Sequence, residues 1–283
     1  MTKQESEDLK KKLALMEQDI KISKTMGDIK HKIAVMSGKG GVGKSTIAVN
    51  LALAFANKGY KTGILDSDLH GPNIPNMLGI TESFLKFDEE GIVPIKSDDG
   101  LEVISTKFLL KDEDSPIIWR GPKKTGAIRQ FLSDVNWGDL DVLIIDNPPG
   151  TGDEPLTILQ SIQSLDGVII VTTPQSVALD DVKKCINMLK HLNVNVIGLI
   201  ENMSGFVCPN CNKKFSIFGE NKGEKIAEKM DIPFLGSLNV DLSVSRSIDN
   251  EVPVLKQDPD SEFSKGFIKI FSKIEDFFKE EEK

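Results

Sequence analysis

Short apolar runs alternate with helical stretches along most of the chain. Six runs have the continuous apolar character of strands that are buried on both faces: residues 32–36, 62–65, 101–105, 142–145, 167–172 and 196–200. Helical periodicity lies between them, over residues 45–57, 123–133, 153–163 and 176–190. This alternation predicts an α/β fold in which a mostly parallel sheet is covered by helices on both faces.

The two ends of the chain carry helical patterns of their own. Apolar residues at helical spacing predict an amphipathic arm over residues 3–24: Leu9, Leu13, Met16 and Ile20. A C-terminal helix gathers seven apolar side chains on one face: Phe263, Phe267, Ile270, Phe271, Ile274, Phe277 and Phe278. Its polar face mixes both charges, whereas a membrane-surface helix is mostly basic there. We expect it to pack on the sheet, with membrane or partner docking as the alternative.

These patterns predict residues 1–30 as an N-terminal helical arm and residues 31–283 as a single domain. Residues 84–100 have the character of a hairpin. Residues 203–219 look like a loop inserted after the last strand. No linker rich in Pro, Gly or Ser divides the domain.

The composition of the chain limits the kinds of molecule that it is expected to bind. The 35 basic and 43 acidic residues give a net charge of −8, which disfavours non-specific binding to nucleic acid or anionic lipid. No apolar run approaches the roughly 20 residues that span a bilayer. The three cysteines exclude a disulfide scaffold and suit a reducing compartment. We expect a cytoplasmic protein with no nucleic-acid partner.

The strongest chemical signal is a phosphate-binding loop between the first strand and the first helix. It matches G-x-x-x-x-G-K-[ST] and consists of Gly38, Lys39, Gly40, Gly41, Val42, Gly43, Lys44 and Ser45. The glycines let backbone N–H groups face a phosphate at a helix N-terminus. Lys44 would bridge the β- and γ-phosphates of ATP, Ser45 would bind Mg²⁺, and Thr46 completes the loop. The alternative is a turn that binds nothing.

Carboxylates follow two of the predicted strands. Asp66 and Asp68 follow residues 62–65, and Asp146 follows residues 142–145, where strand ends line the ligand crevice of such sheets. Asp66 and Asp146 would hold Mg²⁺ with Ser45, which leaves Asp68 to orient the attacking water. How Asp66 and Asp68 divide this work stays open. Helix caps or turn acids are the alternative.

Asp146 also opens a segment that resembles a switch loop, residues 147–153. Within it, Gly150 could present its N–H group to the γ-phosphate.

Two of the three cysteines form a C-x-x-C pair in the inserted loop. Pro209 and Asn210 between Cys208 and Cys211 predict a turn that presents two thiolates, unlike the helix start of a redox pair. Cys185 lies in a helical stretch and is expected to be buried. A zinc ion or an iron–sulfur cluster needs four ligands, and the histidines, His31, His70 and His191, lie elsewhere.

The missing ligands of the pair are therefore expected from a second copy of the chain, on a two-fold axis. An unligated pair or a disulfide is the alternative.

Lys39 gives the loop the pattern K-G-G-x-G-K-S. This pattern resembles the deviant Walker A motif of dimeric ATPases that include MinD, ParA and dinitrogenase reductase. The resemblance implies that Lys39 reaches the nucleotide of a partner subunit and acts there like an arginine finger. A solvated lysine is the alternative.

Several further segments resemble the Mrp/ApbC family of iron–sulfur cluster carriers, over about residues 32–254: residues 66–75, 119–122, 146–153, 171–175 and 201–204, with the C-x-x-C in the expected place. The resemblance implies a three-layer P-loop NTPase fold and a homodimer that hydrolyses ATP slowly. It implies a [4Fe–4S] cluster bridging the subunits through Cys208 and Cys211 and passing to apo iron–sulfur proteins. Asn202 would bind the adenine, with a strand-end cap as its alternative role.

The chain resembles the minimal archaeal-type form of that family. His70 stands where tyrosine is usual, and Asn147 where a less polar residue is common. Two other functions remain open: a MinD/ParA-like positional switch, supported by the C-terminal helix, and a zinc-bridged structural dimer.

Overall fold

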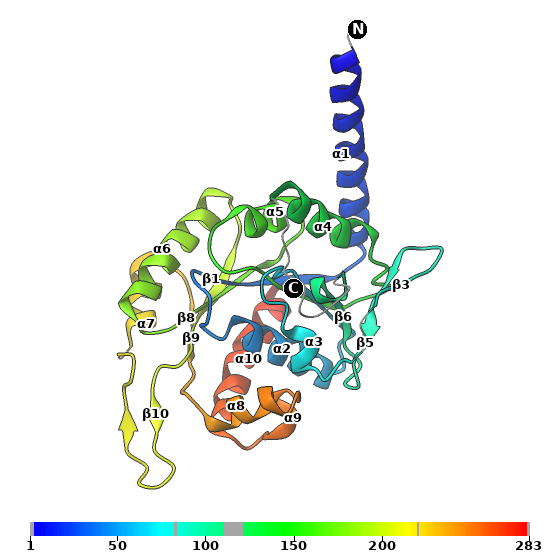
Figure 1. Ribbon diagram of the computed structural model, residues 1–283. Helices are drawn as coiled ribbons and strands as arrows, with labels where there is room; N and C mark the ends of the chain where they lie inside the picture. The colour runs from blue at the N-terminus through cyan, green and yellow to red at the C-terminus, as the bar shows by residue number, and fades with distance from the viewer. Residues whose placement is uncertain (1–2, 82–83, 110–120, 220, 282–283) are drawn as a thin grey trace.

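The computed structural model describes residues 3–81, 84–109, 121–219 and 221–281. Its centre is an eight-stranded sheet (Figure 1) in which only the edge strand β5 runs antiparallel to its neighbour. The strands, in spatial order, are β12 (Phe234–Ser237), β9 (Val196–Glu201), β8 (Gly167–Thr172), β1 (His31–Ser37), β7 (Val142–Asp146), β2 (Thr62–Asp66), β6 (Glu102–Ser105) and β5 (Ile95–Lys96). All six predicted strands are present, and the predicted mostly parallel sheet is confirmed.

Helices cover both faces of the sheet, as predicted. One face carries α2 (Lys44–Asn57), α3 (Ile74–Met77), α8 (Leu242–Asp249), α9 (Val254–Gln257) and α10 (Glu262–Glu281). The other carries the end of α1 (Lys3–Gly27), α4 (Gly121–Asp134), α5 (Asp153–Ser161), α6 (Ser176–His191) and α7 (Lys222–Met230). Strand side chains alternate between the two cores: Ile33 and Val35 face α2, whereas Ala34 and Met36 face the opposite layer.

The apolar face of α10 packs on the sheet. Phe263, Phe267, Phe271 and Phe278 are buried, and the Phe271 and Phe55 rings meet edge to face with centroids 4.9 Å apart. The expected packing is confirmed, and that face is not available to a membrane. None of the helices in the described ranges is both long and apolar enough to cross a bilayer.

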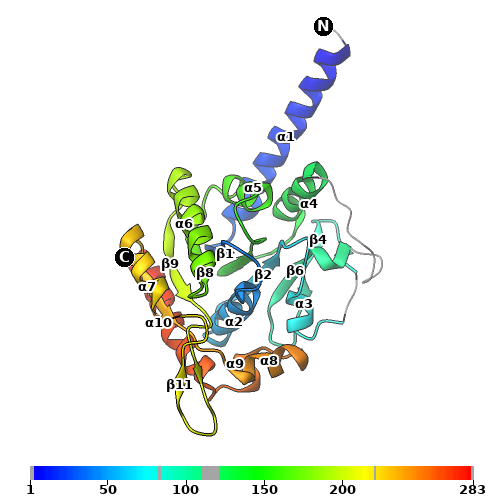
Figure 2. The same ribbon diagram turned by 60° about the vertical axis from the view of Figure 1, so that its left-hand side comes forward.

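Helix α1 has two different halves. Its end packs on α4, where Ile22 and Met26 are buried and the Thr25 hydroxyl donates to the Ser133 carbonyl at 3.1 Å. Its beginning stands out from the rest of the molecule in both views (Figures 1 and 2). The predicted amphipathic arm is therefore helical, and it continues to Gly27.

Small elements complete the fold. Strands β3 (Lys86–Phe87) and β4 (Ile92–Val93) pair as a hairpin within residues 84–100, as expected. A short 3₁₀ helix, Thr106–Leu109, follows β6. Strands β10 (Phe206–Val207) and β11 (Lys214–Phe215) form a second hairpin within the predicted insertion at residues 203–219. This hairpin follows β9, so it leaves the sheet at the carboxyl edge, where the P-loop also lies.

Candidate nucleotide site and cysteine hairpin

The P-loop joins the carboxyl end of β1 to the start of α2. Gly41 and Gly43 adopt left-handed backbone conformations, with φ of 75° and 84°. A Cβ atom on Gly43 would lie 2.3 Å from Asn202 Nδ2, so both conformation and space require glycine there. The loop borders a cavity of about 500 Å³, which Gly40, Gly41, Gly43, Lys44, Ser45 and Thr46 help to line.

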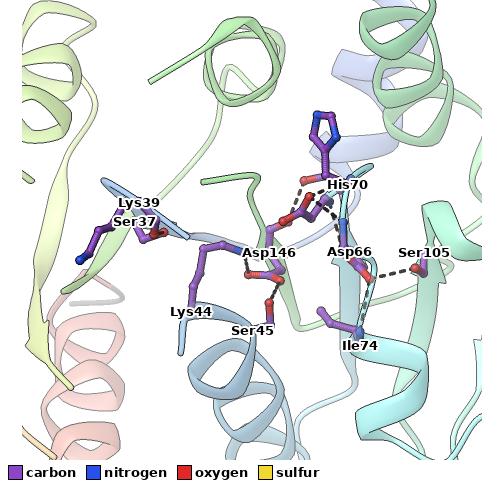
Figure 3. A network of polar contacts seen from close by, with 12 residues as sticks. Ser37, Lys39, Lys44, Ser45, Asp66, His70, Ile74, Ser105 and Asp146 are labelled. Atoms are coloured by element: carbon purple, nitrogen blue, oxygen red, sulfur yellow. Dashed lines mark hydrogen bonds and ion pairs between the residues drawn. The ribbon is translucent and has the colours of Figure 1, made fainter. Parts of the chain in front are cut away.

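Lys44, Ser45 and Asp146 form a largely buried cluster at the mouth of this loop (Figure 3). The Lys44 ammonium donates to Asp146 Oδ1 at 2.6 Å, and the Ser45 hydroxyl donates to Oδ2 at 2.6 Å. Parallel pairing of β1 with β7 places Asp146 beside the loop. The predicted lysine, hydroxyl and Walker B carboxylate are thus side by side.

Asp66 lies on the neighbouring strand β2, in register with Asp146. It is fully buried, and its Oδ2 accepts hydrogen bonds from the Ser105 hydroxyl at 2.9 Å and the Ile74 amide at 3.4 Å. Burial raises the pKa of Asp66, and the nearby Asp146 charge raises it further. Burial also raises the pKa of Asp146, although Lys44 and Ser45 act in the opposite direction.

The oxygen atoms of Ser45, Asp66 and Asp146 suit Mg²⁺, which prefers hard oxygen ligands. Two paired carboxylates that repel each other next to a hydroxyl are the donor set of a divalent cation site. The residues present therefore fit the Mg²⁺ ion that the motifs predict there.

Asp68, two residues after Asp66, is only half-buried and lines the 500 Å³ cavity. Its Oδ1 accepts from the His70 amide at 3.0 Å and the Gly71 amide at 3.2 Å, which holds it in a turn. Asp66 is thus buried beside Asp146, whereas Asp68 faces the cavity. The His70 ring lies 2.7 Å from Lys124 Nζ.

Lys39 and Gly150 contact other residues of the same chain. The Lys39 ammonium donates to Gln175 Oε1 at 2.8 Å. The Gly150 amide donates to the Ser37 carbonyl at 2.8 Å, and the Ser37 hydroxyl donates to the Lys39 carbonyl at 2.9 Å. Lys39 therefore lies on the α6 side of the P-loop, away from Lys44 (Figure 3).

Asn202 lies directly behind the loop. Its Nδ2 donates to the Val42 carbonyl at 2.9 Å. The preceding residue, Glu201, is fully buried, and its Oε2 accepts from the Gly223 amide at 2.5 Å, near the start of α7. Through Asn202 and Glu201, the end of β9 thereby contacts both the P-loop and α7, the helix that follows the cysteine hairpin.

Several residues that support the site were not predicted from the sequence. Ser105 and Gln175 hold Asp66 and Lys39, and neither was predicted to contact the site, although Gln175 ends the family segment at residues 171–175. Ser105 could have been predicted, because it ends β6, the strand that pairs with β2, directly opposite Asp66. The far wall of the cavity comes from the end of α8 and the residues after it: Ile248, Asp249 and Glu251. Nothing in the sequence pattern connects that wall to the P-loop.

Cys208 and Cys211 lie in the turn of the β10–β11 hairpin. The Cys208 amide donates to the Lys213 carbonyl at 3.0 Å, and the Asn212 amide donates to the Cys208 carbonyl at 2.8 Å. Asn212 takes the left-handed φ of 56°. Cys208 is half-buried and Cys211 exposed. The predicted turn is confirmed.

The thiols of Cys208 and Cys185 differ in acidity. Hydrogen bonds from the Asn210 and Cys211 amides and from the Cys211 side chain lower the pKa of Cys208. Burial raises the pKa of Cys185, which lies inside α6, to about 12. Cys185 is thus the expected buried residue, and the hairpin carries the thiol that ionises more readily.

No cluster of three or more His, Cys, Asp or Glu side chains suited to a metal occurs in the described part of the chain. Within the described residues, Cys208 and Cys211 therefore have no further side chains beside them that would complete a metal site.

A family model described as the NUBPL iron-transfer P-loop NTPase, within ParA, matches residues 28–275. The chain belongs to this family. An iron-sulfur cluster carrier protein of Methanocaldococcus jannaschii is 54% identical over 270 residues, which cover 95% of this chain and 92% of the relative. A cytosolic Fe-S cluster assembly factor, Nubp2 homolog 2 of Drosophila yakuba, is 46% identical over 88% of this chain and 98% of its own length.

Solved structures agree with this membership. A nucleotide-binding protein of Archaeoglobus fulgidus in complex with ADP is 40% identical, with a TM-score of 0.75 over 86% of this chain and 94% of its own. The cell division ATPase MinD of Pyrococcus furiosus shares the fold, with a TM-score of 0.64 at 24% identity over 87% of this chain and 98% of its own. The resemblance to iron–sulfur carriers is thus confirmed, and the chain is a P-loop NTPase of the iron-transfer family. Trp119 and Arg120, part of one motif, lie outside the described residues.

Proposed function

We propose that this protein is a cytoplasmic, homodimeric ATPase that carries a [4Fe–4S] cluster between its two subunits and passes it to apo iron–sulfur proteins. One observation carries the proposal: a single chain joins a P-loop with Lys39 to an exposed hairpin that offers two thiols. The names of its relatives as iron–sulfur cluster carriers support the cargo.

The nucleotide half of the proposal rests on the buried cluster. ATP would lie with its phosphates in the P-loop, contacting the loop amides, Lys44 and Gly150, and Asn202 would lie toward the adenine. Ser45, Asp66 and Asp146 would hold Mg²⁺, which neutralises phosphate charge when bound. Asp68, on the cavity wall, would orient water for hydrolysis. The chain's own residues position the reactants and balance charge, which is most of what phosphoryl transfer requires.

Lys39 would serve the partner's nucleotide. To do so it must leave Gln175 Oε1, which holds it 2.8 Å away within its own subunit. A neutral amide is a weaker partner for an ammonium group than a carboxylate. Gln175 therefore fixes the side chain loosely enough for it to cross to a second copy.

The cargo half of the proposal rests on the hairpin. Two copies of Cys208 and Cys211 on a two-fold axis would supply the four thiolates of a cluster. The amides around Cys208 favour its thiolate form. The exposure of Cys211 lets the cluster enter and leave. Transfer to an apo-protein then exchanges thiolate ligands without a redox step.

Anaerobic reconstitution with Fe²⁺ and sulfide tests this function. We expect a [4Fe–4S] Mössbauer signature, one cluster per two chains, and transfer of the cluster to apo-aconitase. The Cys208→Ala/Cys211→Ala variant should bind no cluster, and Cys185→Ala serves as the matched control that should bind normally. Only zinc on the pair, or an equal cluster signal in the double variant, would contradict the proposal.

A further inference from the structure

The first half of α1 carries an apolar stripe that lies open to solvent. Leu9, Leu13, Met16 and Ile20 are 47%, 50%, 54% and 69% exposed. This part of the helix extends beyond the body of the molecule (Figures 1 and 2). A helical segment of this length is only marginally stable in water without a packing partner. The stripe therefore marks a surface on which another element can pack.

The stripe points away from the face on which α1 is anchored. That face is fixed by the buried Ile22 and Met26, and by Arg129 of α4, whose Nε donates to Gln18 Oε1 at 2.9 Å. At about 100° per residue, Leu13 and Ile20 lie roughly 160–180° around the helix from Ile22. A second helix can thus reach the stripe without displacing α4.

The spacing of the stripe is that of a coiled-coil seam. The apolar residues are separated by four, three and four positions, which places Leu9 and Met16 at d and Leu13 and Ile20 at a. Ser6 and Ser23 occupy the next seam positions on either side, so the apolar seam covers residues 9–20. Ile at a with Leu at d favours a two-stranded coil, and Ile20 at a and Leu9 at d match this preference.

The flanking charges are complementary to those of an identical helix. Positions g carry Glu5, Lys12 and Asp19, and positions e carry Lys10, Glu17 and Lys24. In a parallel pair, each g residue faces the e residue five places later on the other helix. All three resulting pairs then join opposite charges: Glu5 with Lys10, Lys12 with Glu17, and Asp19 with Lys24.

The central pair is the most informative. Asp19 already contacts Arg129 Nη2 at 2.6 Å, so its charge is shared with α4. Lys12 and Glu17 lie on the projecting segment and are exposed. A match between one helix and its own copy over three successive pairs favours a second copy of this chain over an unrelated partner.

We propose that two copies of this protein join through residues 9–20 of α1 as a parallel two-stranded coiled coil. This interface differs from the one that would bridge a cluster. Helix α1 leads into the amino end of β1, whereas the P-loop and the cysteine hairpin leave from the carboxyl edge. Two different two-fold interfaces on one chain would link cluster-bridged dimers into larger assemblies.

The test uses the full chain with Cys208→Ser/Cys211→Ser and no nucleotide, which removes the cluster-bridged dimer. Sedimentation equilibrium should then show a monomer–dimer equilibrium. Leu13→Ser should abolish the dimer. Leu15→Ser, a leucine of similar exposure (53%) off the seam, should leave it unchanged. A monomer at every concentration would overturn the coiled coil and leave the carrier function untouched.

Charge reversal then tests the pairing and its direction. Lys12→Glu or Glu17→Lys alone should raise the dissociation constant about tenfold, because two pairs per dimer change from attraction to repulsion. The double variant should restore dimerisation. An antiparallel coil would pair Lys12 with Asp19 and Lys10 with Glu17, so the double variant would stay weak in that arrangement.

Helix content provides the control for the charge reversals. Each reversal also creates a like-charge i,i+4 pair within α1, with Asp8 or with Lys21, and the double variant contains both. If loss of helix explained the single variants, the double variant would be the weakest dimer of the three. Restored dimerisation with equal or lower helix content by circular dichroism supports the parallel coil, and the opposite order overturns it.

Discussion

One aspartate precedes strand β7 and another ends it, and the pKa values of the two shift in opposite directions. Asp146, at its carboxyl end, is fully buried, and burial raises its pKa despite the Lys44 ammonium 2.6 Å away. Asp141, just before the strand, keeps a side chain that is 21% exposed. A hydrogen bond from Lys30 and one from the Lys61 amide, at 2.8 Å, lower its pKa.

The contrast extends to the two edges of the sheet. At the carboxyl edge, Asp66 and Asp146 are both buried, and the Asp146 charge raises the pKa of Asp66, which costs folding energy. At the amino edge, Asp141 and Asp166 accept hydrogen bonds from the Lys61 and Lys32 amides at 2.8 and 2.6 Å, and Asp141 also contacts the Lys30 ammonium. Charges retained despite such a cost are expected at a functional site. The amino edge holds charges that stabilise the fold.

Among the substitutions that distinguish the two edges, Lys39→Ala is expected to have the largest effect on ATP hydrolysis. Lys39→Ala should lower ATP hydrolysis by about 10³-fold, as removal of an arginine finger does, with little change in nucleotide affinity. Lys30→Ala, which removes a lysine from the amino edge, should leave hydrolysis unchanged. Steady-state kinetics and nucleotide titration measure both quantities. If the two variants had equal turnover, Lys39 would have no catalytic role.

The aspartates of β7 give the second comparison. Asp146→Asn should lower hydrolysis by about 10²-fold, because the amide keeps the shape but removes the charge that faces Lys44 and Ser45. Asp141→Asn should hydrolyse ATP at the normal rate. Turnover at saturating ATP and Mg²⁺ checks the pair. A normal rate in Asp146→Asn would mean that β7 does not carry the Walker B carboxylate.

The sequence predicted the carboxyl edge well because its chemistry is local. The P-loop is a contiguous motif, and Asp66 and Asp146 each end an apolar run that can only be a buried strand. Parallel pairing then brings these ends together without further information. The C-x-x-C turn was equally readable, since Pro209 and Asn210 fix its local conformation.

The contacts that the sequence did not reveal join residues that are far apart in the chain. Gln175 meets Lys39 from 136 residues away, and Ile248 closes the cavity opposite the P-loop from α8. Strand β12 was missed as well, because Gly236 and the exposed Ser237 interrupt a run of only four residues. Such contacts depend on how layers pack, which hydrophobic periodicity does not encode.

Two glycines with positive φ, one at each edge, are expected to differ in what an added methyl group disturbs, with smaller effects than those of the lysine and aspartate substitutions. Gly43→Ala should weaken nucleotide binding at least about tenfold, because the new methyl group would lie 2.3 Å from Asn202 Nδ2 and displace the loop. Gly138→Ala, at the amino edge with φ of 59° and open space around it, should cost only about 1 kcal/mol of stability. Nucleotide titration and urea unfolding separate the two outcomes. Equal affinities would show that the loop tolerates the methyl group.

The smallest expected effect is the loss of folding stability in Asp141→Asn. The folded-state pKa of Asp141 lies below the unfolded value of about 4, so its contribution is fully present above that value and is lost as the pH falls through the folded pKa. Asp141→Asn should therefore lose about 1 kcal/mol of stability at pH 7, since the Lys30 contact is partly screened by solvent. The difference from the wild type should vanish at low pH, where Asp141 is protonated. Urea unfolding at a series of pH values measures this. If the difference in unfolding free energy stayed constant down to low pH, the substitution would destabilise the protein through altered packing and not through loss of charge. The charge of Asp141 would then contribute nothing to the stability of the amino edge.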